Sequence, residues 1–156
     1  MSIELEQLNT DPGEGGGRPL PLFLDDVLGS GAIHASAAYI HVPFCFHKCH
    51  YCDFYSIVDK RDRTGDFVTR LENEARSVAE RIDASRIRTI FVGGGTPTIL
   101  PPDELQRVLE AVRSLAGRDP LEEFTVEANP ETVDAAIAGA LVAAGVDRVS
   151  IGCQHR

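Results

Sequence analysis

Apolar residues recur along the chain with two periods, one typical of buried strands and one typical of amphipathic helices. Short apolar runs predict strands at 39–42, 87–92, 123–128 and 146–152. Apolar residues three or four positions apart predict helices at 67–82, 101–116 and 131–144. Gly117 and Gly145 are the expected caps of the last two helices. Strands that alternate with helices predict an α/β fold, a parallel sheet with right-handed helical crossovers.

Residues 1–37 lack this pattern. The segment Asp11-Pro-Gly-Glu-Gly-Gly-Gly is too poor in apolar side chains to pack into a core. We therefore expect a flexible leader at 1–37 and an α/β domain over 38–156.

The composition narrows the range of partners. A net charge of −9 without any basic stripe argues against nucleic-acid binding, which needs positive groups to neutralise phosphates. No segment is long and apolar enough to cross a membrane, and the apolar run around Pro19 to Leu24 is too short and too interrupted by proline for a signal peptide. We expect a soluble, cytoplasmic protein whose cysteines stay reduced.

Three cysteines crowd into eight positions as Cys45-x3-Cys49-x2-Cys52. A four-iron cluster needs four ligands, and thiolates are its usual protein ligands. Three thiolates hold three irons of such a cube and leave the fourth iron open, as in metal sites that perform chemistry. The spacing therefore favours a 4Fe–4S cluster with an open iron.

Other uses of these cysteines stay open. A structural zinc site needs four ligands, and Cys153 or a nearby histidine could complete one. The nearby histidines are His41, His47 and His50. Zinc ligands usually come as two separated pairs, which this triplet does not form. Inert thiols are a further alternative, and disulfides are disfavoured in a reducing compartment.

Unusual residues stand at the carboxyl end of each predicted strand. They are the cysteines after the first strand, Gly93-Gly94-Gly95-Thr96-Pro97 after the second, Glu127 at the end of the third and Gln154 after the fourth. Because the carboxyl ends of parallel strands meet at one edge, where ligands bind in α/β folds, we expect these residues to line one site.

Two of these features also have plainer interpretations. The glycine cluster matches neither the P-loop nor the dinucleotide fingerprint, and a tight turn before a helix is its commoner meaning. Glu127 ends an otherwise apolar strand, so its carboxylate faces water, a cation or a polar ligand such as ribose hydroxyls. The shared edge is what favours ligand binding.

Taken together, the motifs resemble those of the radical SAM superfamily. They are Cys45-x3-Cys49-x2-Cys52, Gly93-Gly94-Gly95-Thr96-Pro97, Glu127-Ala-Asn-Pro and Ser150-Ile-Gly-Cys-Gln154. The flanks Tyr39-Ile-His-Val-Pro-Phe-Cys45 and Phe91-Val-Gly-Gly-Gly-Thr-Pro-Thr resemble the group that contains oxygen-independent coproporphyrinogen III oxidase and the heme chaperone HemW. The resemblance covers residues 38 to 155 and implies a partial TIM-like barrel, the radical SAM core, with about four strands.

The resemblance implies two cofactors. In the superfamily the three cysteines bind a 4Fe–4S cluster, and the amino and carboxylate groups of S-adenosylmethionine (SAM) chelate the open iron. An injected electron then cleaves SAM to methionine and a 5′-deoxyadenosyl radical. The resemblance assigns contacts with SAM or the cluster to Tyr39, Tyr51, Gly94, Gly95, Thr96, Glu127 and Gln154. It also implies an electron donor such as flavodoxin or ferredoxin.

One departure from the family pattern bears on function. The oxidase type carries a further cysteine two positions after the third cluster cysteine, where this chain has Phe54. The form Cys52-Asp53-Phe54 is similar to the HemW branch, which is thought to bind and transfer heme. A heme or porphyrin ligand is therefore implied. The alternatives are oxidative decarboxylation of coproporphyrinogen III and a non-catalytic zinc- or heme-binding module.

A second departure is length, because family members continue through further strand-helix units with more SAM contacts. The resemblance thus implies that residues 1–156 are the N-terminal part of a radical SAM protein, which binds SAM weakly and catalyses no turnover alone. Formation of 5′-deoxyadenosine from SAM by the purified chain and a reductant, measured by liquid chromatography, would contradict this prediction.

Overall fold

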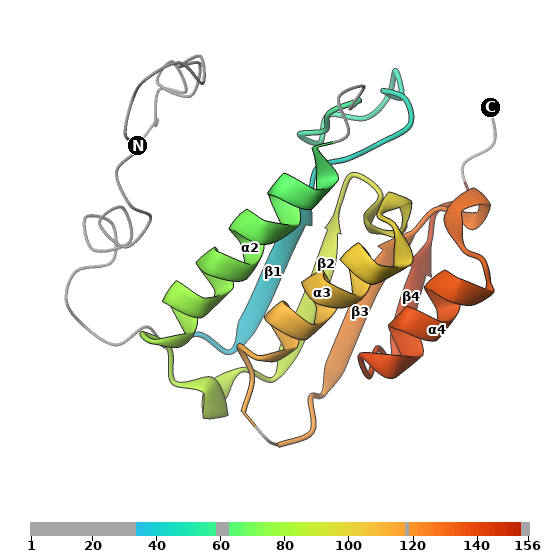
Figure 1. The fold of residues 1–156 in the computed structure, drawn as a ribbon. Helices are drawn as coiled ribbons and strands as arrows, with labels where there is room; N and C mark the ends of the chain where they lie inside the picture. Colours follow the sequence, from blue (N-terminus) through green and yellow to red (C-terminus); the bar gives the residue numbers. More distant parts are fainter. Residues whose placement is uncertain (1–33, 59–62, 118, 154–156) are drawn as a thin grey trace, which may run out of the picture. The chain divides into compact units, whose positions relative to one another are not determined.

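The computed structural model describes residues 34–58, 63–117 and 119–153. This part of the chain forms one parallel sheet of four strands in the order β1-β2-β3-β4 (Figure 1). The strands are β1 (Ala37–Val42), β2 (Thr89–Gly94), β3 (Glu123–Ala128) and β4 (Arg148–Ile151). The predicted parallel α/β fold is confirmed, and within the described residues the sheet is not closed into a barrel.

A helix crosses from each strand to the next. The helices are α2 (Thr64–Ala79), α3 (Pro102–Arg113) and α4 (Ala135–Ala143), with short 3-10 turns at Ala84–Arg86, Pro97–Ile99 and Pro130–Thr132. Figure 1 shows α2, α3 and α4 on the same face of the sheet. Within the described residues the opposite face therefore carries no helix.

The core lies between the sheet and these helices. Alternate strand residues point into it, because successive side chains of a strand project from opposite faces. The buried strand residues on this face are Ile40, Val42, Ile90, Val92, Phe124, Val126 and Ala128. From α3, spacings of three and four residues bring Leu105, Val108, Leu109 and Val112 onto one stripe, where each is 0 % exposed.

The boundary of the second strand differs from the prediction. The strand begins at Thr89, not at Ile87, because Ile87 follows a 3-10 turn whose start is capped by the side chain of Asp83. Ile87 is nevertheless buried in the core. The apolar pattern therefore identified a core residue correctly and misplaced the strand that follows it.

The third predicted helix also starts later than expected, at Ala135. The side chain of Asp134 fixes this start, since its Oδ1 accepts the N–H of Ile137 at 2.8 Å. Residues 130–132 form a separate 3-10 turn instead of the first turn of the helix.

The two expected glycine caps have different outcomes. Gly145 has a φ of +79° just after α4, so the predicted cap is confirmed. Gly117 is not a cap, because α3 ends at Arg113 and its C-cap is Ser114.

Strand β4 lies at an edge of the sheet. It begins at Arg148, later than predicted, and among the described strands it pairs only with β3. Val149 and Ile151 are 40 % and 51 % exposed. Within the described residues β4 is thus an open parallel edge with uncovered apolar side chains.

Two predictions concern residues that the structure does not describe. They are positions 1–33 of the expected leader and Gln154, the expected site residue after the fourth strand. Ala37, the last residue of the expected leader, already belongs to β1. None of the helices in the described ranges combines the length and apolar character needed to span a membrane.

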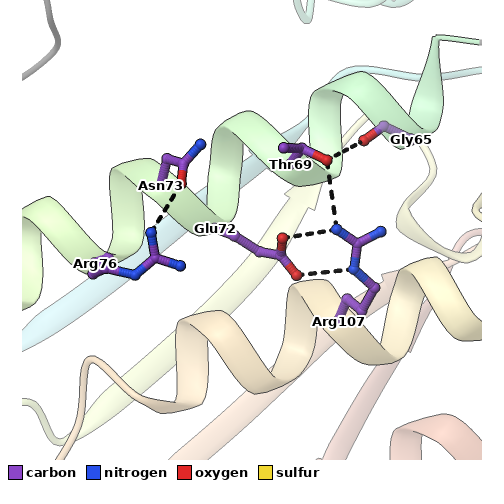
Figure 2. Close-up of polar contacts among 6 residues, drawn as sticks. All are labelled: Gly65, Thr69, Glu72, Asn73, Arg76 and Arg107. Carbon is purple, nitrogen blue, oxygen red and sulfur yellow. Dashed lines mark hydrogen bonds and ion pairs between the residues drawn. The ribbon is translucent and has the colours of Figure 1, made fainter.

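A side-chain ion pair joins α2 to α3 (Figure 2). Nε and Nη2 of Arg107 donate to Oε1 and Oε2 of Glu72 at 2.9 and 2.7 Å, and Nη2 also donates to Thr69 Oγ1 at 3.5 Å. The hydrogen bonds from Arg107 hold the pKa of Glu72 below its ordinary value.

This lowered pKa predicts a pH-dependent contribution to stability. Ionised Glu72 stabilises the fold above its unfolded pKa near 4.5, and the contribution is lost as the pH falls through the folded-state pKa. Glu72→Gln is expected to lower the free energy of unfolding near pH 7 and to lower it less near pH 3, as measured by urea unfolding. Glu74→Gln, at an exposed position of α2, is the matched control. An equal loss at both pH values would contradict the prediction.

Candidate functional site

The face of the sheet without helices is rich in polar side chains. Those from the strands include Tyr39, His41, Thr125, Glu127 and Arg148. The first four alternate along β1 and β3 with buried core residues, which places them on the opposite face, and Arg148 shares that face because it pairs with Thr125. The open face is therefore suited to a polar ligand, whereas the helical face is suited to a core.

The loop after β1 carries the three clustered cysteines and is closed at its base by backbone pairing. The N–H of Cys45 donates to the Ile57 carbonyl at 3.0 Å, and the N–H of Ile57 donates to the Pro43 carbonyl at 2.8 Å. Inside the loop, Lys48 Nζ donates to the Phe54 carbonyl at 2.6 Å. The cysteine loop, defined here as residues 43–57, is thus held at its base and across its interior.

The cysteine loop carries three thiols that are not paired in disulfides. Cys45, Cys49 and Cys52 are free and half-buried, whereas Cys153 is exposed. Across the described ranges, no group of three His, Cys, Asp or Glu side chains converges as a single metal ion would need. A four-iron cube binds each thiolate at a different iron, so its ligands need not converge on one point. The assignment of the three cysteines to a cluster stays a prediction.

The glycine turn after β2, residues 93–97, lies directly against the cysteine loop. The N–H of Gly95 donates to the Val42 carbonyl at 2.7 Å. Thr96 donates its N–H to the Phe44 carbonyl at 2.7 Å, and its hydroxyl lies 3.9 Å from Cys45 Sγ. The two segments that were predicted to share one edge of the sheet are in contact.

Gly94 occupies a position that a side chain could not share. Its φ is +111°, and a Cβ there would lie only 2.4 Å from Nδ1 of His41. Its N–H donates to Oε2 of Glu127 at 3.0 Å. The half-buried Glu127 carboxylate therefore reaches from β3 to fix the backbone of the glycine turn.

Tyr39 lies on the same face of the sheet. Its ring stacks on Phe91 with centroids 6.0 Å apart, and its hydroxyl lies 3.1 Å from Nδ1 of His41. Burial, with a further contribution from the negative charge of Glu127, raises the pKa of Tyr39. The phenol therefore stays neutral and remains a hydrogen-bond donor.

The structure brings most of the expected site residues to one edge of the sheet. Those at this edge are Tyr39, Gly94, Gly95, Thr96 and Glu127. Tyr51 lies on the cysteine loop, 57 % exposed, with its ring against His50. The roles assigned to these residues toward SAM stay predictions.

Two residues of this region make contacts that the sequence did not predict. The sequence offered His41 only as a possible zinc ligand, although its place between buried Ile40 and Val42 already assigns it to the helix-free face. Both of its ring nitrogens have hydrogen-bond partners, so it is not placed to ligate zinc. The contact of Lys48 could not be predicted from the sequence, because it depends on where the folded loop places the Phe54 carbonyl.

Fold and site together define a class of protein, a parallel α/β protein with three clustered cysteines beside a glycine turn at the carboxyl ends of its strands. The family model of the radical SAM superfamily matches residues 39–156. The chain belongs to the radical SAM superfamily, whose members use a 4Fe–4S cluster and SAM.

Relatives of known identity include heme chaperones. HemW of Bacillus subtilis is 40 % identical over 119 residues, which cover 76 % of this chain and 31 % of that protein. HemW of Escherichia coli is 40 % identical over 117 residues, with 74 % and 31 % covered. The mitochondrial radical S-adenosyl methionine domain-containing protein 1 of Danio rerio is 34 % identical over 129 residues, with 83 % and 29 % covered. The matched part of the chain thus spans between 29 % and 31 % of these relatives.

A solved structure supports the fold. Coproporphyrinogen III oxidase (HemN) from Escherichia coli, a radical SAM enzyme, matches with a TM-score of 0.63 and 26 % identity. The match covers 85 % of this chain and 30 % of that enzyme. The strands and helices described above therefore correspond to part of a radical SAM core.

The crowding at Gly94 predicts the effect of a small substitution. Gly94→Ala is expected to destabilise the fold by more than about 1 kcal/mol, because it combines an unfavourable φ with a clash against His41. Gly139→Ala, in the interior of α4 where nothing lies within 4 Å, is expected to stabilise by roughly 0.5–1 kcal/mol. Urea unfolding of both variants checks the prediction, and equal effects would contradict it.

Proposed function

We propose that this chain is the cluster- and SAM-binding part of a heme chaperone of the HemW type. The observation that carries the proposal is the contact between the cysteine loop and the glycine turn, where the Thr96 hydroxyl lies 3.9 Å from Cys45 Sγ. The similarity to HemW proteins at 40 % identity supports the type. Cys45, Cys49 and Cys52 hold the 4Fe–4S cluster and leave one iron for SAM.

The hydrogen bonds of the glycine turn indicate which end of SAM it receives. The N–H groups of Gly94, Gly95 and Thr96 donate to protein oxygens. The turn therefore presents carbonyl oxygens and the Thr96 hydroxyl to a ligand more than it presents N–H donors. Acceptor oxygens suit the amino group of the methionine end of SAM.

The remaining assigned residues complete this SAM site. The negative charge of Glu127 attracts the cationic groups of SAM, while its bond to Gly94 N–H keeps the carboxylate in place. Tyr39 and Tyr51 flank the cluster and SAM, and Gln154 is a further contact. When bound, the cluster supplies the electron for the reductive cleavage of SAM.

The cargo and partners follow from the same proposal. The matched bacterial relatives carry the name heme chaperone, so we assign heme or a porphyrin as the cargo of the whole protein. A flavodoxin or ferredoxin is the electron donor, and the cytoplasm is the compartment. Decarboxylation of coproporphyrinogen is not assigned, because Phe54 places an exposed apolar ring where the oxidase type has a thiol.

Anaerobic reconstitution with iron and sulfide tests this proposal. Wild type and Cys153→Ala are expected to turn brown and to bind four irons per chain, a count set by the cluster type. Cys49→Ala is expected to lose the visible absorbance, because one of three ligands is removed. Cys153→Ala is the matched control, since Cys153 is exposed and lies outside the cysteine loop. Stoichiometric zinc without cluster absorbance in wild type would overturn the proposal.

A further inference from the structure

His41 contacts both segments of the proposed site. It projects from β1 onto the helix-free face and is half-buried. Its Nε2 lies 2.8 Å from the carbonyl oxygen of Tyr55, near the end of the cysteine loop. On its other side the ring fills the space where a Cβ of Gly94 would lie. One imidazole therefore touches the cysteine loop and the glycine turn together.

The partners of His41 define where its proton lies. The Tyr55 carbonyl can only accept, so Nε2 carries the proton and donates. A neutral imidazole has a single N–H, which makes Nδ1 an acceptor for the Tyr39 hydroxyl at 3.1 Å. The neutral Nε2–H tautomer thus satisfies both hydrogen bonds at once.

The link from His41 to the cysteine loop is independent of the backbone pairing at the base of the loop. Backbone hydrogen bonds at Pro43 and Ile57 close the base, as described above. His41 and Tyr55 are 14 positions apart, and their hydrogen bond joins the returning arm of the loop to the open face of β1. The same ring limits the movement of Gly94, whose N–H is held by Glu127.

We propose that His41 is a positioning residue of this site. Its Nε2–H ties the cysteine loop to β1 while its ring buttresses Gly94, so that the thiols and the glycine turn keep a constant separation. The inference rests on the proposed function of the loop as a cluster site. His41 acts through the loop and the turn and is not itself a ligand of the cluster.

Two substitutions separate the hydrogen bond to Tyr55, here called the tie, from the packing of the His41 ring against Gly94. Glutamine places an amide N–H about as far along its side chain as Nε2 of histidine, so His41→Gln keeps a donor for the Tyr55 carbonyl. Asparagine is shorter, so His41→Asn loses this donor. Both variants remove the ring from Gly94, and the difference between them therefore reports on the tie alone. His34→Asn, the same change at an exposed position before β1, is the matched control.

The first measurement needs no cluster. The full chain, free of metal, is alkylated with N-ethylmaleimide, and the label on each cysteine is followed by mass spectrometry, with exposed Cys153 as internal reference. In His41→Asn the labelling of Cys45, Cys49 and Cys52 is expected to be about fivefold faster than in His41→Gln, as the loss of one hydrogen bond implies. His34→Asn is expected to match wild type.

The second measurement follows the reconstituted cluster. Loss of visible absorbance in the presence of a chelator is expected to be about fivefold faster in His41→Asn than in His41→Gln. Equal rates in both variants, for labelling and for cluster loss, would overturn the inference. If wild type takes up no cluster but the labelling difference persists, the proposed function fails and the tie stands.

A further control covers the case in which His41→Asn does not fold. Should His41→Asn unfold, His41→Gln still decides, because it keeps the tie and is expected to label within about twofold of wild type. Labelling of folded His41→Gln as fast as that of the urea-unfolded chain would overturn the inference. Amide hydrogen exchange of β3 shows whether the core of each variant is intact.

Discussion

The hydrogen bonds that join the end of β1 to the end of β2 are the constraint on which the site depends. Gly95 and Thr96 donate their N–H groups to the carbonyls of Val42 and Phe44, each at 2.7 Å. Without them the cysteine loop and the glycine turn would be two separate loops at one edge of the sheet. With them the Thr96 hydroxyl reaches Cys45 Sγ, and two motifs far apart in sequence become one surface.

The two faces of the sheet differ in polarity because the helices cover only one of them. Ile40 and Val42 belong to the core between the sheet and the helices, so the residues that alternate with them lie on the other face of the sheet. Tyr39 and His41 are thereby available for polar contacts on the open face. The polar groups of the candidate site thus come from strand alternation, because the other side of the same strands is apolar.

The sequence alone predicted the parallel α/β fold and placed the candidate site at the carboxyl ends of the strands. Apolar spacing located the strands because burial imposes the period, and β3 was placed to the residue at Glu123–Ala128. Boundaries set by side-chain caps were missed, since Asp83 and Asp134 act through single hydrogen bonds that leave no periodic signal. His41 was missed for a related reason, because its partners come from a different segment and become neighbours only when the loop folds back.

The glycines at the end of β2 lie where a side chain would add packing to the sheet but would not fit. β2 pairs with strands on both sides, yet its last residues, Gly93 and Gly94, contribute no side chain to the sheet. Any larger residue there would collide with His41 or Glu127. A substitution that added side-chain packing at the end of this inner strand would therefore displace the backbone of the glycine turn, which leaves β2 without such packing at the end that contacts the cysteine loop.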